Sequence, residues 1–300
     1  MHDNYDYSIL REVGKVSAEA LAHSKTIVKE GAMLLDIAEE LESFIKKKGM
    51  DLAFPVNIST NSNSAHYTPE AEDRSMLSGN EIVKIDLGAR KDEYLGDCAI
   101  TIDLSGRFSR MVDAASEALE NAISLVKAGR PVNEIGREIA KSAEAKGFRS
   151  IRNLGGHGID KHDLHADIFI PNFDNGETAT LEEGQVIAIE PFVTDGEGIV
   201  AEGEHLQIFQ KTRDATTRSN DLRSISDFID SNYRTYPFAL RWLEKGTASG
   251  EFKIRRALNE LARQDAIESF PVLVEKKGGM VAQAEKEMIV EKGGCEIVTK

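Results

Sequence analysis

The chain contains an internal repeat, and this repeat constrains the fold more than any other feature of the sequence. Residues 16–31 (VSAEALAHSKTIVKEG) align with residues 114–129 (AASEALENAISLVKAG) at an offset of 98 positions. Apolar residues recur at helical spacing in both copies, and the register continues into a second amphipathic segment. Each copy therefore predicts two helices, each followed by a glycine suited to a helix C-cap: Gly31, Gly49, Gly129 and Gly147.

A second match follows the first in the same order. Residues 77–86 (LSGNEIVKID) align with residues 181–190 (LEEGQVIAIE), and both begin with a turn and end an alternating apolar run with a carboxylate. A period near 100 residues is too long for a solenoid. The pattern predicts a duplicated helix–helix–strand unit whose two halves pack around a pseudo-twofold axis. Asp86 and Glu190 are then equivalent strand ends that face each other across that axis.

Residues 211–270 interrupt the repeat and have no counterpart in the first half. This segment is predicted to be helical around 219–231, 236–245 and 253–265, and it carries 11 Lys and Arg against 9 Asp and Glu. We interpret it as an inserted helical subdomain. The discontinuous remainder, residues 1–210 and 271–300, is the predicted catalytic domain.

Composition excludes several classes of protein. The net charge of −14 argues against wholesale binding to nucleic acid. No apolar run approaches the roughly 18–20 residues of a membrane span, and the first residues lack a signal-peptide pattern. Cys98 and Cys295 form no disulfide or metal motif. A cytoplasmic protein is expected.

Two carboxylates stand eleven positions apart in KIDLGARKDEYLGDCAIT. Gly88 and Gly96 bracket the crossing between two antiparallel strands, which would bring Asp86 and Asp97 together. The alternative is that each aspartate is an ordinary turn residue.

Further candidate side chains lie in three later motifs. NLGGHGIDKHDLH holds His157 among glycines, with His162 and His165 behind it. VIAIEPF ends an apolar strand at Glu190. VAQAEKEMIV holds Glu285, and spacing alone does not exclude Glu287 on the same strand face. His66, in NSAHYTP, is a loop histidine whose simpler interpretation is a turn cap.

Five of these residues form a ligand set of four carboxylates and one imidazole, which suits two divalent cations. Without cations, two like charges ~4 Å apart repel by roughly 4 kcal/mol at an effective dielectric of 20. The predicted ligands are Asp86, Asp97, His157, Glu190 and Glu285. No nucleotide-binding glycine motif, GxSxG motif or catalytic cysteine pattern is present.

The ordered motifs FPVNIS and AHYTP, KIDLGA and GDCAIT, GGHGI, LHADIFIPN, AIEPF and QAE resemble the methionine aminopeptidases. The resemblance implies an α+β "pita-bread" (creatinase-like) fold with two pseudo-symmetric halves, an antiparallel sheet and covering helices. The long connection between Glu190 and Glu285 resembles type 2 enzymes, in which a winged-helix-like subdomain is inserted. The absence of a long charged N-terminal extension resembles the archaeal form.

The resemblance also implies roles for individual residues. Asp86 would bind one metal, Asp97 and Glu285 would bridge two (Co, Mn, Fe or Zn), and His157 and Glu190 would complete the second site. Glu190 would be the base for a metal-bridging water. The remaining implied assignments are His66 and His165 as catalytic and substrate-contacting histidines, and Phe54, Leu164 and His205 in the methionine pocket.

The implied substrates are nascent polypeptide N-termini with a small second residue. We expect a monomer with no membrane partner and no specific nucleic acid, and transient ribosome association is open. One departure is visible: the family commonly follows its last glutamate with His-Thr, whereas this chain has Lys286-Glu287. We expect this to change contacts around the ligands without loss of metal.

Two alternatives remain. One is a non-catalytic protein of this fold that binds nucleic acid or a protein partner, for which the insert offers a small basic cluster, Lys253-Ile254-Arg255-Arg256. The retained ligand set argues against it. The other is an Xaa-Pro peptidase, which typically carries a large extra N-terminal domain.

Overall fold

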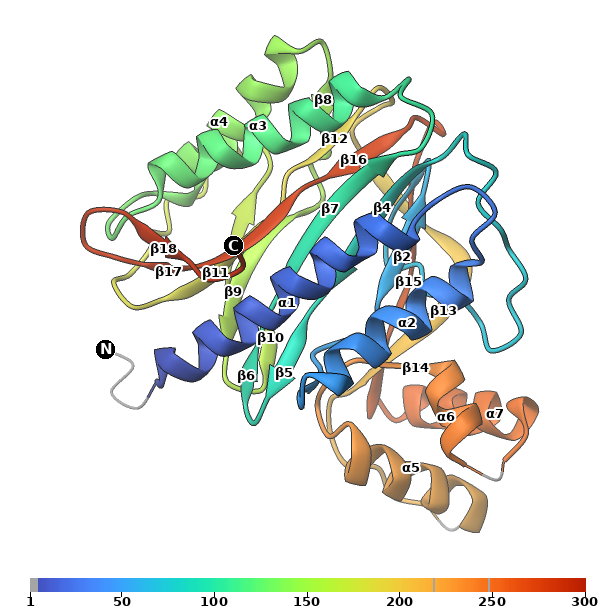
Figure 1. Cartoon of the computed structure of the whole chain (residues 1–300). Helices are drawn as coiled ribbons and strands as arrows, with labels where there is room; N and C mark the ends of the chain where they lie inside the picture. Colours follow the sequence, from blue (N-terminus) through green and yellow to red (C-terminus); the bar gives the residue numbers. More distant parts are fainter. Residues whose placement is uncertain (1–4, 218, 248) are drawn as a thin grey trace.

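The two copies of the repeat form two helix pairs that pack against one curved antiparallel sheet (Figure 1). A computed structural model describes residues 5–217, 219–247 and 249–300. The first pair packs on the strands of the first half, and the second pair packs on those of the second half. The four helices are α1 (Tyr7–Ile27), α2 (Leu34–Lys47), α3 (Ser109–Leu125) and α4 (Val132–Ala145).

The largest sheet runs in the order β10-β9-β11-β17-β7-β4-β2, with β18 paired to β17. All of its printed pairings are antiparallel. Its strands are β2 (Asn57–Thr60), β4 (Ile82–Leu87), β7 (Cys98–Asp103), β9 (Gly155–Asp160), β10 (Asp163–Pro171), β11 (Val186–Ile189), β17 (Glu285–Val290) and β18 (Cys295–Ile297).

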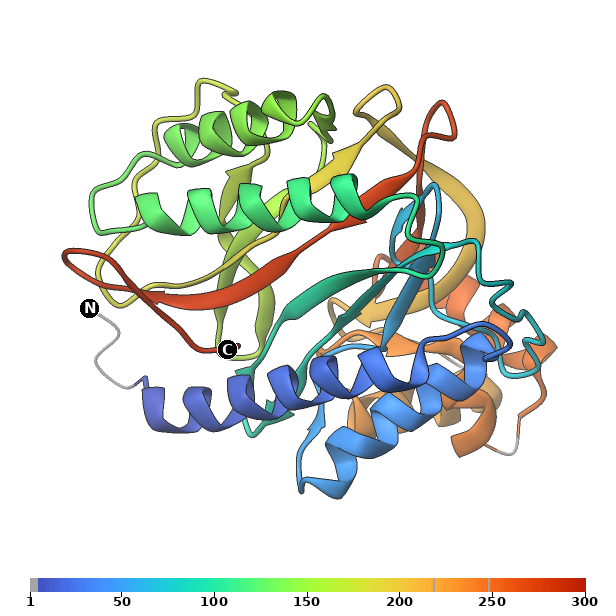
Figure 2. The same cartoon turned by 45° about the horizontal axis from the view of Figure 1, so that its top comes forward.

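Three smaller sheets complete the described strands, and Figure 2 shows the long β13 curving behind the main sheet. The first is β1 (Asp51–Leu52), β5 (Ala89–Lys91) and β6 (Tyr94–Leu95). The second is β16 (Val281–Gln283), β12 (Phe192–Thr194) and β8 (Arg149–Ser150). The third is β14 (Phe238–Ala239), β13 (Val200–Lys211), β15 (Ile267–Glu275) and β3 (Asn63–Ala65).

Equivalent hydrogen bonds confirm the repeat. The amide of Gly31 donates to the carbonyl of Leu77 at 2.8 Å, and the amide of Gly129 donates to the carbonyl of Leu181 at 2.8 Å. All four predicted glycines adopt positive φ between 78° and 86°. Gly49 and Gly147 lie directly beyond the C-caps of α2 and α4, whereas the other two close the turns inside each helix pair. The predicted pita-bread fold class is confirmed.

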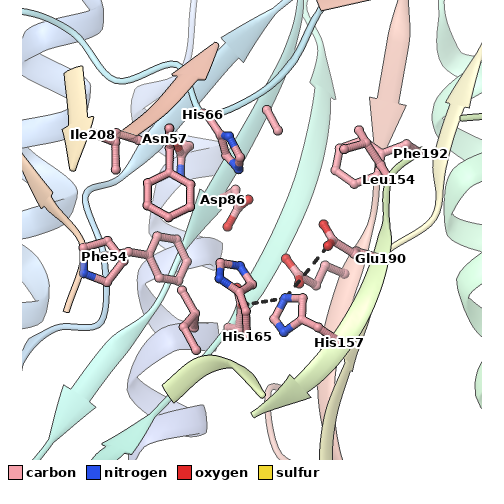
Figure 3. A pocket seen from close by; sticks show the side chains of 16 residues that line it. Phe54, Asn57, His66, Asp86, Leu154, His157, His165, Glu190, Phe192 and Ile208 are labelled. Carbon is pink, nitrogen blue, oxygen red and sulfur yellow. Dashed lines mark ion pairs between the residues drawn. The ribbon is translucent and has the colours of Figure 1, made fainter. Parts of the chain in front are cut away.

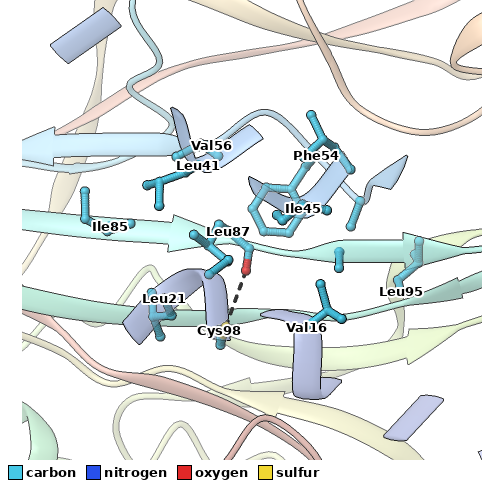
Figure 4. Packing of buried hydrophobic residues seen from close by; sticks show 14 of the residues in the cluster. Val16, Leu21, Leu41, Ile45, Phe54, Val56, Ile85, Leu87, Leu95 and Cys98 are labelled. Carbon is cyan, nitrogen blue, oxygen red and sulfur yellow. Dashed lines mark hydrogen bonds between the residues drawn. The ribbon is translucent and has the colours of Figure 1, made fainter. Parts of the chain in front are cut away.

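The alternation of β4 sorts its side chains between two faces of the sheet. Ile85 and Leu87 are fully buried against apolar residues of α1 and α2 (Figure 4). Asp86, between them, points to the opposite face because successive strand residues alternate. The face turned away from the helices therefore carries the polar residues of the candidate site.

The interrupting segment is helical as predicted. Its helices are α5 (Asn220–Asn232), α6 (Leu240–Gly246) and α7 (Glu251–Arg263), and they pack around an apolar cluster that includes Ile225 and Leu258. The buried guanidinium of Arg241 ties α6 to α2 by pairing with Glu42. The division of the chain into a catalytic domain and an inserted subdomain remains a prediction. None of the described helices combines the length and apolarity needed to cross a membrane.

Candidate metal centre and active-site cavity

Five neighbouring strands of the main sheet each contribute one predicted ligand. In spatial order, β9 carries His157, Glu190 follows β11, β17 begins with Glu285, Asp97 precedes β7, and β4 carries Asp86. Ala99 of β7 pairs with Asp86 on one side and with Glu285 on the other, which aligns three strands in one row. Residues far apart in the chain are thus brought to one place by strand pairing.

Gly88 and Gly96 bring Asp86 and Asp97 together. The two glycines face each other where the chain leaves β4 and returns to β7, and a Cβ added to Gly88 would lie 1.8 Å from the carbonyl oxygen of Gly96. No side chain fits between them. The strand crossing predicted from the two glycines is confirmed.

The orientation of the His157 ring indicates a cation. Its Nδ1 lies 3.1 Å from the carbonyl oxygen of Gly158, so Nδ1 must carry the proton and donate it. The lone pair of Nε2 then faces Asp97 Oδ2 at 3.5 Å and Glu190 Oε1 at 3.9 Å. A nitrogen lone pair and two carboxylate oxygens that face one another repel unless a positive charge lies between them. Ligand atoms of Asp97, His157 and Glu285 all lie within 4.8 Å of one another.

The pKa values of these residues also indicate an excess of negative charge at the site. Burial raises the pKa of Asp86 to about 7. Burial, and then the neighbouring carboxylates, hold the pKa of Asp97 and Glu285 well above their usual values, and Glu190 shifts in the same direction. Burial lowers the pKa of His157 to about 3. Asp86 Oδ1 and Glu285 Oε2 are buried without a hydrogen-bond partner. These residues fit the predicted pair of divalent cations.

A cavity of about 600 Å³, including its opening to solvent, lies against this row (Figure 3). All five predicted ligands line it, as do Phe54, His66, Leu164 and His165. Its walls also include residues that were not predicted as site residues, four of them inside the quoted motifs: Asn57, Ala65, Leu154, Phe192, Ile208, Pro237 and Phe270.

His66 and His165 reach the cavity from different elements. His66 has φ +63° in the loop after β3, and burial lowers its pKa to about 4. The His165 ring lies 4.6 Å from that of His157. It is accessible from the cavity, yet the enclosing walls remove enough water to lower its pKa. Both imidazoles are therefore neutral at physiological pH.

His205 lies outside the cavity. Its Nε2 is 2.8 Å from the carbonyl oxygen of Thr68, and its ring stacks on Tyr67 at 4.3 Å. These contacts hold it on the loop behind His66, and its role in the methionine pocket remains a prediction. His162 lies away from the centre, where its Nδ1 contacts the hydroxyl of Tyr236 at 2.6 Å.

Gln283 joins the two halves of the site. Its Nε2 donates to Glu190 Oε2 at 3.1 Å and is 3.4 Å from Asp86 Oδ2. Asp86 and Glu190 therefore meet across the pseudo-twofold axis through this amide. The motif QAE contained the signal, because Gln283 and Glu285 share one face of an extended segment.

Glu287 is buried but does not line the cavity. Its Oε2 accepts a hydrogen bond from the backbone amide of Asp97 at 3.2 Å. Geometry therefore favours Glu285 over Glu287 as a ligand. Glu287 instead holds the backbone at Asp97, another predicted ligand.

Comparison with known proteins agrees with this geometry. The model of metallopeptidase family M24 matches residues 8–211. The methionine aminopeptidase of Pyrococcus horikoshii is 40% identical over 296 residues, covering 98% of this chain and all of that protein. The methionine aminopeptidase of Saccharolobus solfataricus is also 40% identical, over 96% of this chain and 95% of its own length.

Solved structures with this fold include a thermophilic Arx1, with a TM-score of 0.84 at 19% identity over 98% of this chain and 91% of that one. The methionine aminopeptidase of Thermotoga maritima has a TM-score of 0.72 at 23% identity over the whole of both chains. At these identities the two structures establish the fold alone. The full-length sequence relatives go further: the chain belongs to metallopeptidase family M24 and, within it, to the methionine aminopeptidases.

Proposed function

We propose that this chain removes the initiator methionine from nascent polypeptides whose second residue is small, using two divalent cations. The observation that carries the proposal is the convergence of four carboxylates and the Nε2 lone pair of His157 on one cavity. Membership of the methionine aminopeptidases supports the choice of substrate. We assign the chain to the archaeal-like type 2 enzymes because of its long, partly helical connection between Glu190 and Glu285.

Asp86, Asp97, His157, Glu190 and Glu285 would hold the two cations. When bound, the cations supply Lewis-acid activation of water and of the scissile carbonyl. Carboxylate-rich donor sets accept Co, Mn, Fe or Zn, so availability in the cell selects the metal.

The chain's own groups then move protons and position the peptide. Glu190 accepts the proton that water releases and returns it to the departing amine. His165 donates a hydrogen bond to the carbonyl oxygen as negative charge develops there. Neutral His66 contacts the scissile amide. Phe54 and Leu164 hold the methionine side chain, and His205 has no part in this proposal.

We propose that residues 211–270 form an inserted subdomain of a cytoplasmic monomer. Pro237 in this segment lines the cavity, so the insert helps shape the substrate's entrance. Transient association with the ribosome would bring the enzyme to its nascent substrates.

The basic cluster of the insert does not favour specific nucleic-acid binding. Lys253 pairs with Asp221 at 3.5 Å, and Arg255 pairs with Glu251 at 2.6 Å. These neighbouring carboxylates neutralise much of the positive charge that phosphates would need.

A peptide assay tests the proposed function. Free methionine should be released from Met-Gly-X and Met-Ala-X peptides, lost on addition of a chelator, and restored by Mn²⁺ or Co²⁺. Met-Leu-X peptides should be poor substrates. Cleavage of Xaa-Pro peptides in preference to Met-Gly-X, or methionine release that resists exhaustive chelation, would contradict the proposal.

A further inference from the structure

One acceptor in the cavity has no assigned partner. Among the described residues that line the cavity, four have a buried side-chain polar atom without a hydrogen-bond partner: Asp86 Oδ1, Glu285 Oε2, His66 Nδ1 and Asn57 Oδ1. The proposed function assigns His66 to the scissile amide. The proposed cations explain the two carboxylate oxygens. The amide oxygen of Asn57 is left over, and a buried acceptor without a donor costs about 1–3 kcal/mol.

The direction of the Asn57 amide follows from its neighbour. Its Nδ2 donates to the carbonyl oxygen of Pro55 at 3.3 Å. Because a carbonyl only accepts, the nitrogen must face Pro55. Oδ1 is the atom turned the other way, and the residue is only 6% exposed.

Strand pairing places Asn57 beside the carboxylates. Asn57 of β2 pairs directly with Asp86 of β4, and residues directly opposite each other project from the same face. The view in Figure 3 shows Asn57 between Asp86 and the apolar side chain of Ile208. Asn57 thus extends the row of acceptors by one strand, to the boundary between the carboxylates and the apolar wall.

The substrate has one donor that belongs at this boundary. The methionine side chain has no N–H or O–H, and the scissile amide is assigned to His66. The α-amino group is bonded to the carbon that carries the side chain, so it lies where apolar wall and carboxylates meet. We propose that Asn57 Oδ1 accepts a hydrogen bond from the substrate's α-amino group and so positions the free N-terminus. This inference rests on the proposed function.

The test compares two ligands that differ only in this amine. L-methioninamide carries it, and 4-(methylthio)butanamide lacks it. Isothermal titration calorimetry on the Mn²⁺-loaded protein measures binding of both ligands to the wild type, Asn57→Leu and Asn57→Asp. Asn57→Leu should weaken L-methioninamide by about tenfold, the effect of losing one hydrogen bond of ~1.4 kcal/mol. The dissociation constant of the desamino ligand should change by less than about threefold. Asn57→Asp retains the acceptor but loses the donor to the Pro55 carbonyl, so it should bind L-methioninamide more tightly than Asn57→Leu does.

Ser59→Ala is the matched control. Ser59 lies on the same strand and has a buried oxygen without a partner, but it does not line the cavity. This variant should bind both ligands as the wild type does. Equal weakening of both ligands in Asn57→Leu, or no weakening of either, would overturn the inference. Calorimetry requires no turnover, so this failure is distinct from a failure to release methionine from peptides.

Discussion

At the scale of single residues, the hydrogen-bond partner of each imidazole nitrogen decides what the ring's other nitrogen can bind. A backbone carbonyl accepts a hydrogen bond from Nδ1–H of His157, so the unprotonated Nε2 faces the carboxylates. A backbone carbonyl also contacts His205, but at Nε2, and the ring stacks on Tyr67 outside the cavity. Residue type alone therefore does not tell whether a histidine reaches the cavity; His157 lines it and His205 does not.

Glu190 is the residue on which the proposed proton transfer depends. Glu190→Gln keeps the shape of the side chain but removes its capacity to accept a proton. We expect kcat to fall by about 10²–10⁴-fold, the usual contribution of general acid–base catalysis. The melting temperature should stay close to that of the wild type.

The control for Glu190→Gln is Glu182→Gln, at an exposed position in the turn before the same strand. It should leave the rate of methionine release from Met-Gly-X peptides unchanged. Activity near the wild-type level in Glu190→Gln would show that another group takes the proton.

At the scale of elements, β17 explains how the chain accommodates Lys286-Glu287. Alternation buries Glu285 and Glu287 on one face, where the first lines the cavity and the second holds the backbone amide of Asp97. On its other side, the amide of Glu287 donates to Thr299 Oγ1 at 2.9 Å. One strand thus supplies a ligand and also supports the loop that carries another.

Replacing Glu287 by leucine removes this support at similar volume. We expect metal affinity to fall about 10–100-fold, as is typical when a group behind a ligand is lost. Calorimetric titration of metal-free protein with Mn²⁺ measures it. Glu287→Gln still accepts from Asp97 through its amide oxygen and should bind the metal more tightly than Glu287→Leu. Identical affinities in both variants would rule out this hydrogen bond as the cause.

At the scale of the whole molecule, the fold holds carboxylates close enough to repel one another, and bound cations would offset this repulsion. Four strands from both halves of the repeat each bring a carboxylate, and a fifth brings His157, into one row. Folding without cations therefore forces protons onto groups that are ionised in the unfolded chain. The stability of the protein is linked to metal and to pH together.

This linkage predicts the pH dependence of thermal unfolding. The pKa of Asp86 is about 7 in the folded protein against its ordinary 3.8. Its contribution to the stability of the metal-free protein is therefore complete below pH 3.8 and disappears as the pH rises through 7. The lowered pKa values of His66 and His157, about 4 and about 3, change stability only below their ordinary 6.5.

Above about pH 6.5 the carboxylates thus dominate the linkage, Asp86 up to about pH 7. Asp97, Glu190 and Glu285 act in the same direction because their pKa values are also raised. Metal-free protein should lose melting temperature over this range, and the difference from Mn²⁺-loaded protein should widen. Calorimetric scans with chelator and with Mn²⁺ at several pH values measure both. The metal-free Asp86→Asn variant should show a shallower decline up to about pH 7. A gap between loaded and chelated protein that stays constant with pH would contradict this account.

The sequence by itself determined the elements and the symmetry. Helical periodicity, the four glycines and the repeated strand ends depend on neighbours within a few positions, so they could be predicted. Apolar alternation ending in an acid, a local pattern, indicated Asp86 and Glu190, and the glycines around the strand crossing indicated Asp97. Glu285 was predicted from the order of motifs that the chain shares with the methionine aminopeptidases. Only the tertiary structure decided which strands meet. The pairing of β17 with β11 and β7 places Glu285 at the cavity and Glu287 at the backbone amide of Asp97. Packing of β16 brings Gln283 to both Asp86 and Glu190, and the pairing of β2 with β4 places Asn57 beside Asp86. These outcomes depend on contacts between distant segments. Packing sets the geometry of those contacts, and it cannot be predicted from the spacing of nearby residues.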